Sequence, residues 1–124
     1  MSLELVWEEA GVVRIFSGTV TTEDVRNSIE KVHADIRFPM LEYSINDFLA
    51  VTSIDVSKSA LANAAMRTIG DSHSNASILV AIVATQPEIQ ALAGFYSSPS
   101  YMPYPAKMFG SVEGARRWIA DHSS

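Results

Sequence analysis

The chain has 124 residues, no cysteine, and nine basic against fourteen acidic residues, so its net charge is −5. This length predicts a single domain, residues 1–124, with one hydrophobic core. Net negative charge repels phosphate backbones, which argues against nucleic acid as a partner. The lack of cysteine excludes disulfides, thiol catalysis and cysteine zinc sites, and it suits a reducing cytoplasm.

No stretch has the pattern of a targeting or membrane segment. Residues 1–11 lack the basic segment followed by an apolar run that makes a signal peptide. The longest apolar run, residues 78–84, is far too short to cross a bilayer. We therefore expect a cytoplasmic protein.

The chain begins with a predicted hairpin followed by a helix. Apolar and polar side chains alternate over residues 3–17, which is typical of two short strands joined by a turn, and Gly18 is expected to end the second strand. Residues 21–24 supply a hydroxyl cap and two acids, which favour a helix start. Apolar residues at intervals of three to four predict that this helix continues to about residue 35.

A strand, a turn and a second helix are predicted next. The strand, residues 43–51, alternates so that Phe48 and Val51 lie on opposite faces. Small and apolar residues at helical spacing follow from Ser57, and Gly70 supplies the stop.

The second half of the chain continues to alternate strands with helices. Residues 77–84 are apolar without alternation, the pattern of a strand covered on both faces, and we place this strand at the centre of the sheet. Residues 85–88 match a capping box with proline in the first turn of a helix. A loop with three prolines, 97–105, leads to a short strand, 106–109, and Ser111 caps a final helix.

The element order ββαβαβαβα predicts an α/β fold, with a mixed, mostly parallel five-stranded sheet and flanking helices. In such sheets, ligands usually bind where the carboxyl ends of the strands meet. Asp55, Thr85 and Gly110 are the residues expected at that edge.

A strand led by aspartate and a polar turn before a small-residue helix resemble the STAS domain of anti-sigma-factor antagonists. The matching residues are Asp47, the segment 52–57 and Ala60-Leu61. That family carries an Asp-Ser-Ser-Gly-Leu type of turn at a helix N-terminus, and its second serine is the regulatory phosphorylation site. Aligned on Asp55, this serine corresponds to Ser57. Val56 stands in place of the first serine, and Lys58-Ser59 replaces the glycine and lengthens the turn.

A second similarity, to the SpoIIAA-like group, covers nearly the whole chain. The matching residues are Trp7, 16–18, 35–38, 46–48, 81–84, 109–111 and 115–119. Members of this group are similar in fold both to STAS domains and to the lipid-transfer CRAL-TRIO domain. The resemblance therefore implies ligand or membrane association at least as much as phospho-regulation.

Ser57 has two interpretations. A phosphate there would meet the free N–H groups and the positive end of the helix, and would add about two negative charges that could repel a partner. Alternatively, Ser57 or Asp55 is the cap of the helix and has no regulatory role.

Aromatic side chains near the proline-rich loop predict an apolar cleft between the helix that begins at Pro87 and the sheet. The residues expected to line or cover it are Phe48, Phe95, Tyr96, Tyr101, Met102 and Tyr104. Apolar walls with a few hydroxyl anchors are what small-molecule sites require. The alternatives are ordinary core packing beneath a capping loop, or an exposed patch for a protein partner, a second copy of the chain or a membrane surface.

No set of residues predicts catalysis or metal binding. His33, His73 and His122 lack the HxxxH or HxxH spacing of a metal site. A triad of Ser57, His73 and Asp55 is rejected, because a helix with a rise of about 1.5 Å per residue separates the serine from the histidine. Glycine-rich phosphate loops are absent, which argues against nucleotide chemistry. We expect no metal, no cofactor and no enzyme activity.

The sequence therefore predicts a non-enzymatic domain that works by binding. The leading hypothesis is a small apolar or lipid-like ligand in the cleft, or association with a membrane surface from the cytoplasm. The alternative is a protein-interaction switch that is phosphorylated at Ser57 and binds a regulatory protein. A homodimer is a further prediction, and an enzyme is the third class.

Overall fold

The computed structural model describes residues 3–72, 74–75, 77–98 and 102–122 of the chain. The elements, in order, are β1 (Leu3–Trp7), β2 (Gly11–Thr21), α1 (Thr22–His33), the 3-10 turn η1 (Phe38–Met40), β3 (Tyr43–Asp55), α2 (Lys58–Asp71), β4 (Leu79–Val83), α3 (Pro87–Tyr96), β5 (Ala106–Phe109) and α4 (Val112–His122). This order is the predicted ββαβαβαβα.

The strands form one sheet in the order β1-β2-β3-β4-β5. β1 is antiparallel to β2, and the other neighbouring pairs are parallel. The predicted mixed, mostly parallel sheet is therefore confirmed. Its centre is β3 rather than the apolar strand β4, so that part of the prediction is wrong. Four of the five residues of β4 are nevertheless buried, because helices cover both of its faces.

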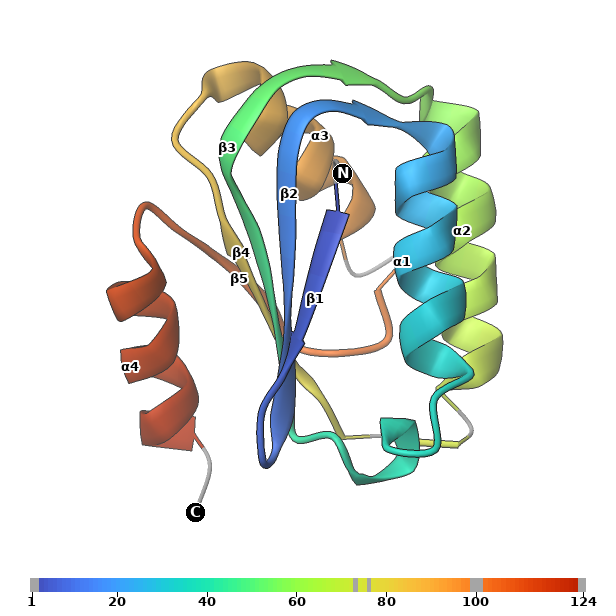
Figure 1. Cartoon of the computed structure of the whole chain (residues 1–124), viewed down its shortest axis with the longest axis vertical. Helices are drawn as coiled ribbons and strands as arrows, with labels where there is room; N and C mark the ends of the chain where they lie inside the picture. The colour runs from blue at the N-terminus through green and yellow to red at the C-terminus, as the bar shows by residue number, and fades with distance from the viewer. Residues whose placement is uncertain (1–2, 73, 76, 99–101, 123–124) are drawn as a thin grey trace.

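Helices cover the sheet on both sides. In Figure 1, α1 and α2 stand on one side of the sheet and α4 on the other. α3 lies on the same face of the sheet as α1 and α2, and these three helices enclose a common cavity. Right-handed crossovers between successive parallel strands place their helices on one face. Neighbouring residues of β2 therefore pack into hydrophobic clusters on opposite faces of the sheet. Val12 packs with Val32 of α1, whereas Val13 packs with Ala115 of α4.

β2 and β3 extend beyond the rest of the sheet. The pairing of β3 with β4 ends at Asp47 and Val83, whereas β2 and β3 stay paired as far as Thr21 and Asp55. The register shifts between Ile15 and Ser17 and again between Gly18 and Thr19, and such bulges bend a strand. The extension arches toward α1 and α2 and leads directly into both helices (Figure 1).

Three details of the predicted strands and helices are wrong. Gly18 does not end β2, because its φ of 65° lets the chain bend and continue as a strand. Gly70 does not end α2, which includes it. Phe48 and Val51 do not lie on opposite faces. They join the same apolar cluster, because the register shift reverses the alternation between them.

The helix starts confirm one predicted cap and correct another. Thr21 and Asp24 form a reciprocal capping box at α1, as the sequence predicts. The capping box predicted at residues 85–88 is wrong. Gln86 is the N-cap of α3 without a side-chain cap bond, and its amide instead donates to the carbonyl of Val51 at 2.7 Å.

Candidate functional site

A cavity of about 120 Å³ lies between the sheet and helices α1, α2 and α3. Its wall is mainly apolar and includes Phe16, Val32, Phe48, Ile82, Ile89 and Leu92. An engineered apolar cavity of about 150 Å³ is known to bind benzene, so this space suits one small apolar molecule.

Most of the residues predicted to line an apolar cleft do lie in this wall. They are Phe48, Tyr96, Met102 and Tyr104. Phe95 is not among them, and its ring lies 5.3 Å from Nζ of Lys58 instead. Tyr101 lies outside the described residues. Because Met102 and Tyr104 are buried, they belong to the cavity wall rather than to an exposed patch.

Arg14 of β2 also lines the cavity, and it was not predicted from sequence. It is 8% exposed, and its Nη1 donates to the Ser44 hydroxyl and, at 3.2 Å, to Oδ1 of Asn46. Its Nε has no hydrogen-bond partner among the described residues. Burial lowers the pKa of Arg14 to about 10, so the guanidinium stays charged at neutral pH. Alternation along β2 places Arg14 on the same face as the buried Val12 and Phe16, and this pattern in the sequence could have indicated a buried arginine.

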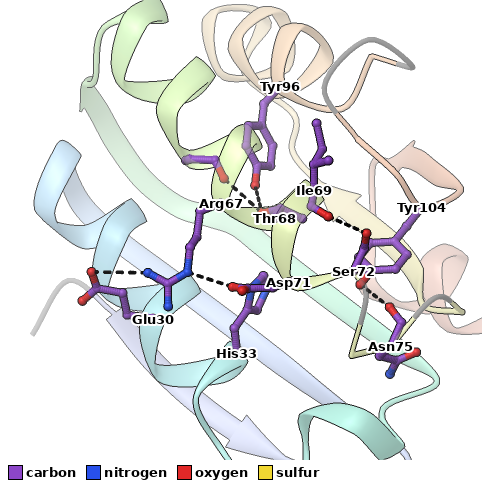
Figure 2. A network of polar contacts seen from close by, with 11 residues as sticks. Glu30, His33, Arg67, Thr68, Ile69, Asp71, Ser72, Asn75, Tyr96 and Tyr104 are labelled. Carbon is purple, nitrogen blue, oxygen red and sulfur yellow. Dashed lines mark hydrogen bonds and ion pairs between the residues drawn. The ribbon is translucent and has the colours of Figure 1, made fainter.

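Polar side chains fasten α1 to α2 beside the cavity (Figure 2). Nδ1 of His33 and Nε of Arg67 both lie 2.8 Å from Oδ2 of Asp71, and Arg67 is also 4.0 Å from Glu30. Burial lowers the pKa of His33, the hydrogen bond to Asp71 opposes that shift, and the charge of Arg14 adds to it. A neutral imidazole that donates Nδ1–H to the carboxylate fits these contacts.

The two tyrosines of the cavity wall use their hydroxyl groups within the protein. The Tyr96 hydroxyl lies 3.0 Å from Oγ1 of Thr68, which ties α3 to α2 (Figure 2). The Tyr104 hydroxyl donates to the carbonyl of Asn75 at 2.5 Å, and the Asn75 amide donates to the carbonyl of Phe38 at 2.9 Å. These hydroxyls were expected to anchor a ligand. They are hydrogen-bonded to the chain itself, whereas Nε of Arg14 has no partner among the described residues.

Ser57 lies at the start of α2 and is exposed. Its Oγ accepts a hydrogen bond from the N–H of Ala60 at 3.1 Å, which makes it the helix cap. Asp55, the other predicted cap, is the last residue of β3 and does not occupy the N-cap position. The first turn of α2 contains Lys58 and no acidic residue.

α2 also exposes apolar side chains on its outer surface. Met66 is 70% exposed and Ile69 is 42% exposed. Together with Ser59 and Ala62 they follow helical spacing, so the four form one stripe along the helix. This α2 stripe starts in the turn that Ser57 caps.

Two classes of site find no counterpart in the described part of the chain. Its His, Asp and Glu side chains form no group of three or more that could hold a metal ion, and His73 lies outside it. Over the same residues, every helix is too short or too polar to cross a bilayer.

The strand order, the mixed sheet and the helix layers define an STAS/SpoIIAA-like fold. The chain is similar to the anti-sigma factor antagonist SpoIIAA in its unphosphorylated form, with a TM-score of 0.64 and 12% identity over 98% of this chain and 99% of that one. It is also similar to the Bacillus cell fate determinant SpoIIAA in the phosphorylated form, with a TM-score of 0.61 and 14% identity over 94% of this chain and 98% of that one.

A third similar structure is an uncharacterized protein with a SpoIIAA-like fold from Shewanella loihica PV-4. Its TM-score is 0.55, and its 16% identity extends over 94% of this chain and 91% of that one. No protein-family model and no curated protein sequence matches the chain. At these identities, the similarity establishes the fold.

Proposed function

We propose that this protein is a cytoplasmic regulatory domain that binds a protein partner and is switched by phosphorylation of Ser57. The observation that carries the proposal is the position of Ser57. It is exposed and caps α2 in a fold that is shared with SpoIIAA, an anti-sigma factor antagonist with structures in both phosphorylation states. The partner would be a protein of the anti-sigma-factor class, and the proposal includes no catalytic step.

The start of α2 favours a phosphate electrostatically. The free N–H groups of the first turn and the positive end of the helix dipole attract an anion. Lys58 adds a positive charge, and the first turn has no acid that would repel the phosphate. A phosphate on Ser57 would therefore change the surface by about two negative charges while α2 stays folded.

The α2 stripe supplies a surface for the partner. Met66 and Ile69 leave apolar area open to solvent, and a partner that covers it gains the free energy of removing that area from water. Ser57 lies at one end of this surface. A phosphate there would repel an acidic partner. Against a neutral partner surface, the charge of the phosphate would be buried without a counterion. In both cases binding would weaken.

The test is phosphorylation and binding with the serine-kinase anti-sigma factors of the same organism. After incubation with kinase and ATP, mass spectrometry is expected to find phosphate on Ser57. Ser57→Asp should weaken partner binding by about tenfold or more, since a misplaced charge is unfavourable by more than about 1.4 kcal/mol. The matched control is Ser111→Asp, which adds the same charge at an exposed serine that accepts a bond from the Gly114 N–H at the start of α4, on the other side of the sheet, and should leave the affinity unchanged. Phosphate found only at other positions, or unchanged affinity of Ser57→Asp, would contradict the proposal.

The cavity supports a second candidate function, the binding of a small apolar ligand. Its wall is apolar, and the contacts of His33 with Asp71 and of Thr68 with Tyr96 hold three helices around it. Sites for drug-sized ligands measure about 300–1,000 Å³, so this cavity suits a molecule smaller than a membrane lipid. Association with a membrane surface and formation of a homodimer stay predictions from sequence.

Toluene tests the second candidate without involving any charge. In two-dimensional NMR spectra, toluene-saturated buffer is expected to shift the signals of cavity residues such as Phe48 and Ile82. Ala93→Phe, in the cavity wall, should fill the space and abolish the shifts. Ala91→Phe, on the exposed side of the same helix, should leave them unchanged. Absence of shifts in the unmodified protein would contradict this function.

A further inference from the structure

Arg14 is a buried cation without a counterion in the described part of the chain. Its side chain extends from β2 into the cavity, only 8% of its surface is exposed, and its Nε is unpartnered. The two groups that accept from it, the Ser44 hydroxyl and the Asn46 amide oxygen, are both neutral. The described ion pairs all involve other side chains.

An unpaired charge in this position is unfavourable. Desolvation of a buried ion costs several kcal/mol even after relaxation, and proteins therefore pair buried charges or neutralise them. Neutralisation does not occur at pH 7, because the pKa of Arg14 falls only to about 10. The carboxylate of Asp71, whose partner His33 lines the cavity, is already bound by His33 and Arg67. Because no carboxylate among the described residues pairs with Arg14, an anionic ligand in the cavity would supply its counterion.

The rest of the cavity restricts what that ligand can be. Apart from Arg14 and polar side chains such as Ser28, Ser44, Asn46 and Thr68, the wall of the whole cavity is mainly apolar and includes Phe48, Ile82 and Leu92. The hydroxyl groups of Tyr96 and Tyr104 are hydrogen-bonded to the protein. One cation in a mainly apolar wall matches a molecule with one negative charge and a hydrocarbon body. A phosphate monoester carries up to two charges and more acceptor oxygens than this wall can satisfy.

We propose that the cavity binds a small apolar monocarboxylate, whose carboxylate pairs with the Arg14 guanidinium and whose hydrocarbon part fills the space beside Phe48 and Ile82. This proposal rests on the second candidate function and adds the chemical class of the ligand. The planar guanidinium presents N–H groups in a fork that matches a carboxylate, and the unpartnered Nε is one of these donors. The volume of about 120 Å³ suits a body of the size of benzoate or hexanoate.

The test compares charged and uncharged ligands of the same shape by calorimetry and NMR. Benzoate and hexanoate are expected to bind at least about tenfold more tightly than benzamide and hexanol, a difference of about 1.4 kcal/mol. Palmitate, whose chain exceeds the cavity, is expected not to bind. Arg14→Met should lose the preference for carboxylates, and circular dichroism checks that it folds. Arg26→Met, which removes an exposed arginine of α1, should keep the preference.

The outcomes distinguish a failure of the carboxylate proposal from a failure of ligand binding in the cavity. If benzamide binds as tightly as benzoate, or if Arg14→Met retains the preference, the assignment of Arg14 is wrong while the cavity function stands. If palmitate binds and the small acids do not, the proposed ligand size is wrong. If neither the acids nor their neutral analogues bind, and toluene also fails, both the inference and the second candidate function are overturned.

Discussion

Nδ1 of His33 on α1 lies 2.8 Å from Oδ2 of Asp71 on α2, and the His33 side chain is only 5% exposed. The bond joins two helices that cover the same face of the sheet (Figure 2). Burial is the largest influence on the pKa of His33 and lowers it from the ordinary 6.5. Burial would raise the pKa of Asp71, but the hydrogen bonds from His33 and Arg67 outweigh it and leave that pKa lowered.

The lowered pKa of His33 predicts that the protein loses stability under mildly acidic conditions. Between the folded pKa and the unfolded value of 6.5, the unfolded chain binds a proton that the folded chain does not. The free energy of unfolding should therefore fall as the pH drops below 6.5 and level off below the folded pKa. Urea denaturation at a series of pH values measures this slope.

The matching variants identify the residue responsible for the slope. His33→Asn should flatten the dependence in that window, whatever its effect on stability at pH 7. His122→Asn removes the exposed histidine of α4 and should retain the slope. An unchanged slope in His33→Asn would assign the effect to another group.

A second loss of stability, below pH 3.8, is expected from Asp71 as its carboxylate gains a proton.

Replacing Arg14 by methionine should stabilise the ligand-free protein. The change removes an unpaired buried charge, whose burial is unfavourable by several kcal/mol, and keeps an unbranched side chain in the same space. It leaves the Ser44 hydroxyl and the Asn46 amide oxygen without the donor Nη1, at about 1–3 kcal/mol, while the Asn46 amide nitrogen keeps its bond to the carbonyl of Ala81 at 3.2 Å. A net gain of about 1 kcal/mol in urea denaturation is expected.

The control for this variant is Arg26→Met. Arg26 is exposed and pairs with Glu23 at 2.8 Å, and such surface pairs contribute about 0–1 kcal/mol. Its replacement should therefore leave stability nearly unchanged or slightly lower. If Arg14→Met proves less stable than Arg26→Met, the bonds to Ser44 and Asn46 compensate the charge, and no outside counterion is needed.

The fold was predictable because its main determinants are local. Strand and helix periodicity, the cap at Thr21 and the apolar run of β4 each act within about ten residues. Crossover handedness then limits how the elements assemble. The apolar wall of the cavity was partly predictable for the same reason, since Phe48, Tyr96 and Met102 are large apolar residues in neighbouring elements.

The polar part of the cavity was not predictable, because it depends on register between strands. Val12 lies opposite Ser44, and Arg14 lies opposite Asn46, in the parallel pair β2 and β3. A shift of one residue would turn these side chains to the other face of the sheet. The periodicity of a single strand does not reveal that pairing. The role of Gly18 was missed similarly, since a bulge shows itself only against a partner strand.

Gly18 and Gly70 are expected to respond oppositely to alanine. Gly18 has a φ of 65°, which strains an L-residue even though no atom lies within 4 Å of an added Cβ, so Gly18→Ala should cost about 1–2 kcal/mol. Gly70 lies within α2, and no atom lies within 4 Å of a Cβ added there. Gly70→Ala should therefore raise the free energy of unfolding by about 0.5–1 kcal/mol. Thermal unfolding measures both. Gly94→Ala in α3, another helical position with open space, should behave like Gly70→Ala.

Ser57 should contribute to stability as a cap, independently of any role as a switch. Ser57→Ala removes the acceptor of the Ala60 N–H bond and is expected to cost about 1 kcal/mol in urea denaturation. Ser57→Asp keeps an oxygen acceptor and adds a charge that the helix dipole favours, so its stability should equal or slightly exceed that of the unmodified protein. Ser59→Ala, at an exposed position that is not the cap, should change stability by less than about 0.5 kcal/mol.

If Ser57→Asp is stable but fails to bind the partner, the loss of binding is caused by the added charge rather than by unfolding. Equal destabilisation of Ser57→Ala and Ser57→Asp would show that the side chain at this position supports α2 by something other than its cap bond.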